Sequence, residues 1–380
     1  RMTPLAEAIL PLTPNDQYFS YQWGMQGSAY GIGLPVARRY TTGAGVTIGI
    51  VDSGVRQTLT DLSATSFLPP YNAITSQLGG TDENGHGSHV AGTIAQATNN
   101  RIGCAGIAPL ARILSVKALD ANGRGTNFTI GSAIRYAVDK GCSVINLSVG
   151  GSPSQTLRDA VSYATSRNVL LVCASGNGGT ARLTYPAAYS ETLSVGALTE
   201  EGRRAGFSQY GPGLGIVAPG QEILQQTFSK GTGRAGYYYF SGTSMATPMV
   251  TGVAALAKAL QPSLTRAELK LLLLSTATDL GSRGTDPEYG AGLLNAAKAC
   301  ERAAGGGPAP GPIPTRRRPC TVLSVTLRGE LVPLNDDGDA INPTAANGPS
   351  GTQGPAGSNR ATRLLPARHV GNRPSVQGWK

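Results

Sequence analysis

The sequence lacks any apolar run of the roughly 18 residues that a membrane-spanning helix requires. Charged residues are also scarce, at 14% of the 380 residues, whereas 40% are hydrophobic. No internal repeat is evident. A chain of this length and composition can bury a large core, so we expect a soluble protein with one main domain and no membrane span.

Histidine is rare, with three residues in the chain. His369 lies in a region of weak pattern, and His89 follows His86 by one helical turn among apolar residues, where a buried structural histidine is expected. His86 is left as the candidate base. The pair lacks the glutamate and the i,i+4 spacing of a zinc-protease helix, so we do not expect a zinc hydrolase.

The five cysteines are an odd number, so at least one is unpaired within a monomer. Cys142 and Cys173 lie in or beside buried strand patterns, where free cysteine behaves as a small hydrophobic residue. Cys300 and Cys320 could form one bridge, a pairing that the sequence leaves open.

The formal net charge of +10 could indicate a nucleic-acid partner, but the basic residues are scattered between glycine-rich loops. Their one cluster, 316–318, follows the stretch 305–312, which has the glycine and proline content of a linker. Such a cluster indicates a solvated or protease-sensitive segment. We therefore expect no specific nucleic-acid partner.

Ser244 stands at the start of an apolar helical pattern that runs to about Leu260, directly after the strand-like stretch 237–240. Its hydroxyl is expected at a helix N-terminus, where partial positive charge favours a developing oxyanion. Serine is also a common N-cap residue, so this position alone does not indicate catalysis. The Gly-x-Ser-x-Gly motif of esterases is absent around it.

Two further motifs strengthen the catalytic interpretation. The stretch 48–54 is rich in β-branched residues and contains Asp52, which predicts a buried strand with a carboxylate at its carboxyl end. In 84–93, glycines flank His86 at the start of another helical pattern. Strand ends and helix starts lie along one edge of an open parallel α/β sheet, so all three side chains can meet there.

Asp52, His86 and Ser244 are the residue types that nucleophilic acyl transfer needs. A histidine takes the proton of the serine hydroxyl, and a carboxylate holds the imidazole in the correct tautomer and stabilises the imidazolium. The order Asp, His, Ser along the chain is that of subtilisin. From about residue 14 to 299, the chain resembles the subtilisin-like serine proteases, and by loop length it looks closest to their thermitase-like branch.

This resemblance implies that Asp52, His86 and Ser244 form a catalytic triad. Ser88 and Ser175 stand where threonine and alanine are commoner in the family, which leaves the chemistry intact. The resemblance also implies that Asn177, after the buried run 169–174, supplies the side-chain amide of the oxyanion hole. An isolated Asn-Gly would otherwise be interpreted as a turn.

Substrate binding in the family uses two extended segments that pair with the peptide backbone as added strands. By resemblance, the substrate-binding residues are Gly123, Arg124, Gly125, Ser148, Val149, Gly150, Ala174 and Gly176. The S1 pocket would lie between 149–151 and 174–176 and be lined by small, uncharged residues. We expect large apolar or neutral P1 residues, while Arg124 at the rim leaves the preference beyond S1 open.

A structural Ca²⁺ site is also implied, one that ties the N-terminal arm to the catalytic domain. Calcium takes six to eight oxygen ligands. By resemblance to thermitase-like proteins, side-chain oxygens would come from Asp16, Asp61 and Asn100, and backbone carbonyls from Ala97, Ile102 and Cys104. Either Asp61 or Asn100 alone would be an ordinary loop residue, so the interpretation depends on the match at three separated positions.

Strand and helix patterns alternate up to the linker, which predicts an α/β fold, a three-layer α/β/α sandwich with a mostly parallel sheet. Expected strands cover 46–51, 112–117, 143–148, 169–174 and 192–197, and expected helices cover 86–97, 129–140, 156–167, 244–260 and 266–276. We divide the chain into an arm or propeptide remnant (1–13), a subtilisin-like peptidase domain (14–300), a Gly/Pro/Arg-rich linker (301–319) and a C-terminal extension (320–380), mostly irregular or a truncated module.

Together these inferences predict a secreted serine endopeptidase that acts on polypeptides, with an inhibitory propeptide as partner and a monomeric state. The chain begins at Arg1 without an initiator methionine or secretory signal, so we expect a processed or partial product. A maturation protease or peptide cyclase of the same fold would need a long inserted capping element, and none is seen. A catalytically silent binding scaffold would have lost a triad residue, and all three are present.

Overall fold

The structure is a computed structural model that describes residues 13–305. Several predicted features lie outside the described residues. They are the arm at 1–12, the linker after residue 305, the tribasic cluster, Cys320, His369 and the C-terminal extension.

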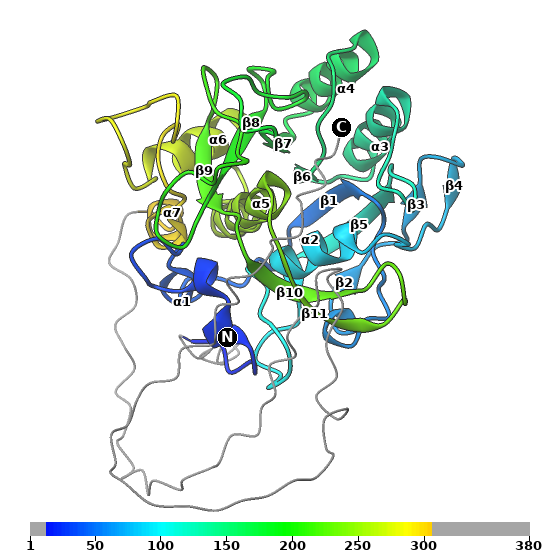
Figure 1. Ribbon diagram of the computed structural model, residues 1–380, viewed down its shortest axis with the longest axis horizontal. Coiled ribbons are helices and arrows are strands. Elements are labelled where there is room, and N and C mark those ends of the chain that lie inside the picture. Colours follow the sequence, from blue (N-terminus) through cyan, green and yellow to red (C-terminus); the bar gives the residue numbers. More distant parts are fainter. Residues whose placement is uncertain (1–12, 306–380) are drawn as a thin grey trace, which may run out of the picture. The chain divides into compact units, whose positions relative to one another are not determined.

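A mostly parallel sheet forms the middle of the domain (Figure 1). Its strand order is β4-β3-β5-β1-β6-β7-β8-β9, with β2 also paired to β5, and only β3 and β4 run antiparallel to each other. β1 lies between β5 and β6, well inside the sheet. The strands are β1 (Thr47–Asp52), β2 (Ser66–Phe67), β3 (Tyr71–Asn72), β4 (Gln77–Leu78), β5 (Arg112–Lys117), β6 (Val144–Leu147), β7 (Leu170–Ala174), β8 (Leu193–Leu198) and β9 (Ile216–Pro219).

Helices cover both faces of this sheet, so the predicted three-layer α/β/α sandwich is confirmed (Figure 1). A separate hairpin, β10 (Ile223–Phe228) with β11 (Ala235–Phe240), packs against α2 and leads into α5. The α-helices are α1 (Leu34–Ala37), α2 (His86–Ala95), α3 (Asn127–Asp139), α4 (Gln155–Ser166), α5 (Thr243–Leu260), α6 (Arg266–Ser275) and α7 (Ala296–Ala303), and short 3-10 helices cover Phe19–Tyr21, Trp23–Met25 and Thr60–Leu62.

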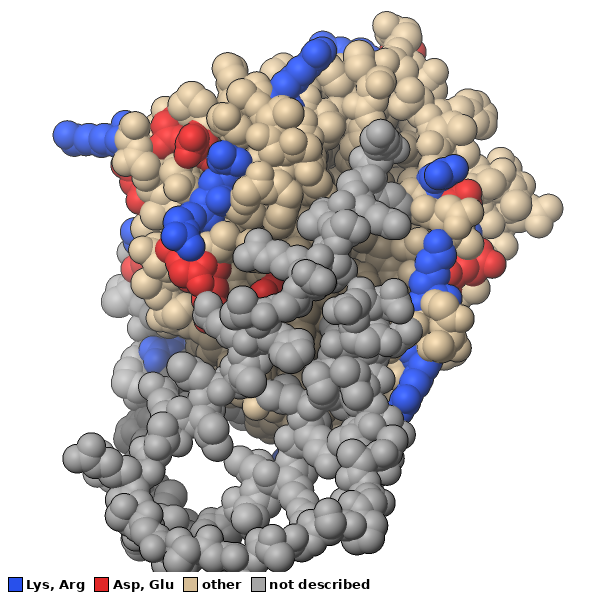
Figure 2. Space-filling view, viewed as in Figure 1, with Lys and Arg blue, Asp and Glu red and all other residues tan. Residues whose placement is uncertain are grey.

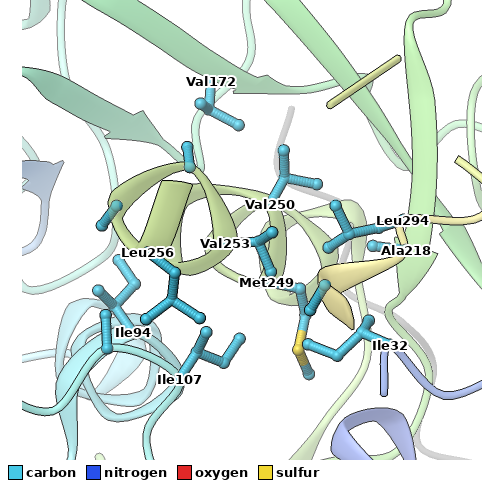
Figure 3. Close-up of a cluster of buried hydrophobic side chains, with 14 of the residues drawn as sticks. Ile32, Ile94, Ile107, Val172, Ala218, Met249, Val250, Val253, Leu256 and Leu294 are labelled. Carbon is cyan, nitrogen blue, oxygen red and sulfur yellow. The ribbon is translucent and has the colours of Figure 1, made fainter. Parts of the chain in front are cut away.

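Two hydrophobic cores lie on opposite faces of the sheet because successive strand residues point to alternate sides. Ile48 and Ile50 of β1 join the core with α2 and α5, whereas Val51 joins the core with α3 and α4. Figure 3 shows the first core, where Val253 of α5 lies in one cluster with side chains of the sheet and with Ile94 of α2. Full burial of such a side chain contributes about 1.5–3 kcal/mol, so these cores fix the central strands and α5 relative to each other.

The predicted strands and helices are all present, with ends that differ by two residues at most. The largest shift at a helix start is in α3, which begins at Asn127 because Thr126 caps it in a capping box with Thr129. β10 was missed, since Gln225 and Gln226 make it polar in sequence although every residue of it is buried.

Within residues 13–305, no helix is both long and apolar enough to cross a membrane. On the face shown in Figure 2, the Lys and Arg side chains of the described residues are spread singly, and several lie beside Asp or Glu. The described part of that face has no large basic patch.

Candidate active site

β1 and α2 bring Asp52 and His86 into contact. Asp52 is the last residue of β1, and His86 is the first residue of α2. Nδ1 of His86 lies 2.8 Å from Oδ1 of Asp52, and the amide of Ser53 donates to the same oxygen at 2.7 Å. A side chain at Gly87 would collide with the carbonyl oxygen of Gly54 and press on Asp52, so this close approach needs glycine.

The two histidines of α2 have opposite electrostatic surroundings. Burial lowers the pKa of His86, but the charge of Asp52, its hydrogen bond and the charge of Asp82 outweigh burial, so the pKa lies above the usual 6.5. For His89, burial lowers the pKa to about 3. Its Nε2 faces the carbonyl oxygens of Ile223 and Tyr238 at 2.9 and 3.1 Å. His89 is a buried structural histidine, as the apolar pattern predicts.

Ser244 lies in the first turn of α5, at the carboxyl edge of the sheet. Its Oγ donates to the carbonyl oxygen of Ser148 at 3.2 Å, and Ser148 Oγ donates to the carbonyl oxygen of Ser244 at 2.8 Å. The parallel register pairs Ile50 of β1 with Asn146 of β6, so Asp52 and Ser148, each two residues further on, reach the same edge. The edge predicted from the strand and helix pattern therefore holds Asp52, His86 and Ser244.

Asn177 follows β7 and is fixed by the residue before Ser244. Its Oδ1 accepts hydrogen bonds from the amide and the hydroxyl of Thr243, both at 2.9 Å. The position that a Cβ on Gly242 would take is 3.4 Å from Nδ2 of Asn177 and 3.6 Å from the amide nitrogen of Ser244. Two donor nitrogens therefore lie close to the same point beside Gly242, where there is no side chain.

The predicted substrate-binding segments follow strands of the sheet. Gly123, Arg124 and Gly125 lie in a turn after β5, where the Asp120 side chain accepts from the amide of Arg124 at 2.9 Å, and Arg124 and Gly125 are exposed. Ser148, Val149 and Gly150 follow β6, and Ala174 and Gly176 end or follow β7.

Thr184 occupies the space between two of these segments, a placement that the sequence did not reveal. A Cβ on Gly150 would lie 2.6 Å from Thr184 Oγ1, and a Cβ on Gly176 would lie 2.9 Å from Thr184 Cγ2. The Thr184 amide donates to the carbonyl oxygen of Ser175 at 3.0 Å. No local motif marks Thr184, because it reaches this position only through the tertiary fold.

The residues predicted to bind calcium lie at one loop. Asp61 is fully buried, and its carboxylate accepts from Asn100 Nδ2 at 2.8 Å and from the amide of Cys104 at 2.9 Å. The amide of Ala97 donates to the carbonyl oxygen of Asp61 at 3.0 Å. The amide of Ile102 donates to Asn100 Oδ1 at 2.9 Å, so this oxygen would reach an ion only after the Asn100 amide rotates.

Asp16 brings the segment before the sheet to the same loop. Its carboxylate accepts from the amides of Asn99 and Asn100 at 2.9 and 3.5 Å. Neither Asp16 nor Asp61 forms an ion pair within the described residues. Burial raises the pKa of both carboxyl groups, and the charge of Asp16 raises that of Asp61 further.

These residues fit a calcium ion by their chemistry. A cation would offset the cost of burying two charged carboxylates, and the predicted donors are all oxygens, as calcium prefers. Across the described part of the chain, no group of three His, Cys, Asp or Glu side chains could hold a metal ion. The predicted ligand set has two carboxylates, Asp16 and Asp61, and its other oxygens are amide and carbonyl oxygens.

The cysteines of the described part are buried and form no disulfide with one another. They are Cys104, Cys142, Cys173 and Cys300. Burial raises the pKa of the Cys142 and Cys300 thiols to about 12. The pairing considered between Cys300 and Cys320 stays untested, since Cys320 lies outside the described residues.

Comparisons with known proteins show the family to which the chain belongs. Residues 43–292 match the model of the Subtilase family. Subtilisin BL of Lederbergia lenta is 45% identical over 285 residues, which cover 74% of this chain and 98% of that protein. A thermophilic serine proteinase of Bacillus sp. (strain AK1) is 40% identical over 280 residues, 73% of this chain and 67% of that protein.

Solved structures show the same likeness. The chain resembles a protease from Pseudoalteromonas arctica PAMC 21717 with a TM-score of 0.71 and 30% identity over 77% of this chain and 99% of that one. A cold adapted subtilisin-like serine proteinase gives a TM-score of 0.61 and 32% identity over 67% of this chain and 90% of that one.

Fold, sequence and structural matches together define a serine endopeptidase. The chain belongs to the subtilase family, so the predicted family and enzyme class are confirmed. The narrower assignment to the thermitase-like branch stays a prediction.

Proposed function

We propose that the chain is a secreted endopeptidase of broad specificity in which Asp52, His86 and Ser244 form the catalytic triad. Ser244 Oγ attacks the carbonyl carbon of the scissile peptide bond while His86 takes its proton. His86 then gives the proton to the leaving amine, and water hydrolyses the acyl-enzyme. Asp52 accepts a hydrogen bond from the proton-bearing Nδ1 of the imidazole, which keeps the ring in the tautomer whose Nε2 can act as the base. It also stabilises the imidazolium.

The developing oxyanion would lie between the Asn177 side-chain amide and the Ser244 backbone amide. The support for this role is that both donor nitrogens lie close to the same point beside Gly242. Thr243 fixes the oxygen of the Asn177 side chain, which directs its NH₂ group to the opposite side. Preorganised donors of this kind stabilise the transition state without reorganising during the reaction.

The observation that carries the proposal is the 2.8 Å contact between His86 Nδ1 and Asp52 Oδ1 in a buried site. A fluorophosphonate should label Ser244 alone, and Ser244→Ala should abolish both labelling and proteolysis. Labelling at another serine, or full activity of Ser244→Ala, would contradict the assignment.

The peptide substrate would insert as a strand between Gly123–Gly125 and Ser148–Gly150. These segments follow β5 and β6, which flank β1. Two strands on either side of a third lie about 10 Å apart, so there is room for one strand between the segments that follow them. The P1 side chain would then enter the pocket between 149–151 and 174–176, whose uncharged lining favours apolar or neutral residues.

We further propose that Ca²⁺ binds at the loop formed by Asp16, Asp61 and 97–104. Its role would be structural: it would neutralise the two carboxylates and hold the segment at Asp16 against the domain. The side-chain oxygen of Asn100 and the carbonyls of Ala97, Ile102 and Cys104 would complete the ligands.

The remaining predictions belong to the same proposal. They are export, a monomeric state, an inhibitory propeptide and the division of the chain into 1–13, 14–300, 301–319 and 320–380. A dedicated maturation protease or peptide cyclase is the alternative from the same fold. Mapping by mass spectrometry of the sites cut in a denatured protein distinguishes them: many sites support the broad endopeptidase, and a single site or a ligated product supports the alternative.

A further inference from the structure

Asp82 is a buried carboxylate beside Asp52 and His86 that the mechanism above leaves unused. It is 1% exposed and lies in the loop before α2. Its Oδ1 accepts hydrogen bonds from Ser53 Oγ at 2.9 Å, the amide of Asn84 at 2.9 Å and the amide of Gly85 at 3.0 Å. Its Oδ2 accepts from the amide of Ser88 at 2.9 Å and from the Ser88 hydroxyl at 2.7 Å.

In each of these hydrogen bonds, a carboxylate oxygen of Asp82 is the acceptor. An ionised carboxylate carries acceptors only, on two oxygens, whereas an asparagine side chain carries an NH₂ group in place of one of them. In this site that NH₂ group would face an N–H or O–H donor. The surroundings are therefore specific for a charged aspartate.

These hydrogen bonds join the two elements that carry Asp52 and His86. Ser53 directly follows Asp52 at the end of β1, and its Oγ also accepts from the amide of Gly87 at 3.0 Å. Gly87 and Ser88 belong to the first turn of α2, which begins with His86. Asp82 thus ties the end of β1 to the first turn of α2, beside the contact between Asp52 and His86.

We propose that Asp82 is a positioning residue of the peptidase reaction, which holds the end of β1 against the start of α2 and thereby keeps Asp52 and His86 in reactive geometry. The inference rests on the proposed roles of Asp52 and His86. Asp82 acts through these two residues and through Ser53, without touching the substrate.

The charge of Asp82 adds an electrostatic effect. The charges that raise the pKa of His86 are those of Asp52 and Asp82, and His89 lies one turn further along the same helix. Behind the end of β1, Lys117 donates to the carbonyl oxygen of Ser53 at 2.9 Å and pairs with Glu83 at 3.2 Å. The negative charge of Asp82 favours the imidazolium form of His86, as that of Asp52 does. Removing that charge should lower the pKa of His86, a shift that a loss of folding stability alone would not produce.

The test is Asp82→Asn in the full chain, with a neutral peptide substrate. We expect kcat to fall about 10- to 100-fold with KM changed less than about threefold, because misplacement of reacting groups by 1 Å costs about 100-fold. The acid limb of the kcat/KM profile should also move to lower pH. Glu83→Gln is the matched control, since it neutralises the neighbouring acid, whose side chain is 59% exposed. It should change neither kcat nor KM more than about twofold.

Two further variants keep the proposal testable if Asp82→Asn does not fold. Ser53→Ala removes the hydrogen bond that Asp82 accepts from the residue after β1, and Ser88→Ala removes the one that it accepts from a hydroxyl of α2. Both should lower kcat, and Ser88→Thr, which keeps the hydroxyl, should restore most of the loss seen in Ser88→Ala. An unchanged kcat in folded Asp82→Asn or Ser53→Ala, with only a lower melting temperature, would overturn the positioning role.

Failure of the inference can be told apart from failure of the proposed function. If Ser244→Ala is inactive while Asp82→Asn is fully active, the triad stands and the role of Asp82 falls. If Ser244→Ala retains activity, the assignment of the triad fails, and the role of Asp82 falls with it.

Discussion

The side-chain oxygen of Asn177 accepts hydrogen bonds from both the amide and the hydroxyl of Thr243, each at 2.9 Å. Thr243 directly precedes Ser244 in the chain. The candidate oxyanion donor and the candidate nucleophile are therefore held together by one residue, and a change at Asn177 should affect the reaction more than it affects binding.

We predict that Asn177→Leu lowers kcat by about 100- to 1,000-fold with a small change in KM, because the oxyanion forms only after attack. This magnitude is the one known for subtilisin. Thr243→Val removes the hydroxyl donor while the amide donor remains, so its effect should be smaller. Steady-state kinetics with one peptide substrate decides the matter, and a large rise in KM at constant kcat would contradict the assignment.

The side chain of Thr184 leads to a prediction about specificity. Wild-type enzyme should cleave after Phe or Leu faster than after Arg or Asp, because an unpaired charge is costly to bury in an uncharged pocket. Thr184→Gly removes the side chain that lies between Gly150 and Gly176, so kcat/KM should rise more for P1 Phe than for P1 Ala. Faster cleavage after Arg would show that the pocket has been misinterpreted.

The raised pKa of His86 predicts the pH dependence of catalysis. A general base must be unprotonated, so kcat/KM should fall as pH decreases, with a midpoint above the usual 6.5. Folding stability should depend on pH in the opposite sense, because His86 binds its proton more tightly in the folded chain than in the unfolded chain. The contribution of His86 to stability is therefore complete at low pH and is lost as pH rises through the folded-state pKa. An acid-limb midpoint below 6.5 would contradict the electrostatic description of His86.

Chelation should destabilise the domain without altering the triad chemistry at first. A ligand that binds only the folded state stabilises it by about 4 kcal/mol at a thousand times its dissociation constant. EDTA should therefore lower the melting temperature of Ser244→Ala, a variant in which autolysis cannot interfere. Asp61→Asn provides the control, because its melting temperature should respond less to calcium.

The same site should respond to pH. The raised pKa values of Asp16 and Asp61 mean that, without a cation, their contribution to stability is present at low pH and is lost as pH rises through the folded-state values. Calcium should restore that loss, so the shift in melting temperature on adding calcium should be larger at neutral pH than under acidic conditions. An unchanged melting temperature in EDTA at neutral pH would remove the case for the site.

How much the sequence predicts depends on whether a residue has a local pattern around it. The position of Asp52 in the fold was predicted because a buried strand ends at its carboxylate, and that of His86 because glycines flank it at the start of a helical pattern. Thr184 and Asp82 had no such pattern, since each acts through contacts made by the tertiary fold. Asp82 precedes Asn84 and Gly85 and resembles an ordinary loop acid until its donors from β1 and α2 are known.

The position of β1 inside the sheet has a consequence for when activity can appear. Asp52 ends a strand whose neighbours on both sides come later in the chain, and Ser244 bonds to Ser148 across 96 residues. Pairings of this kind form slowly, because the entropy of closing long loops is lost before the contacts are gained. If Asp52, His86 and Ser244 form the catalytic centre as proposed, a chain that is only partly synthesised or partly folded would lack it, which would delay proteolysis until the domain is nearly finished.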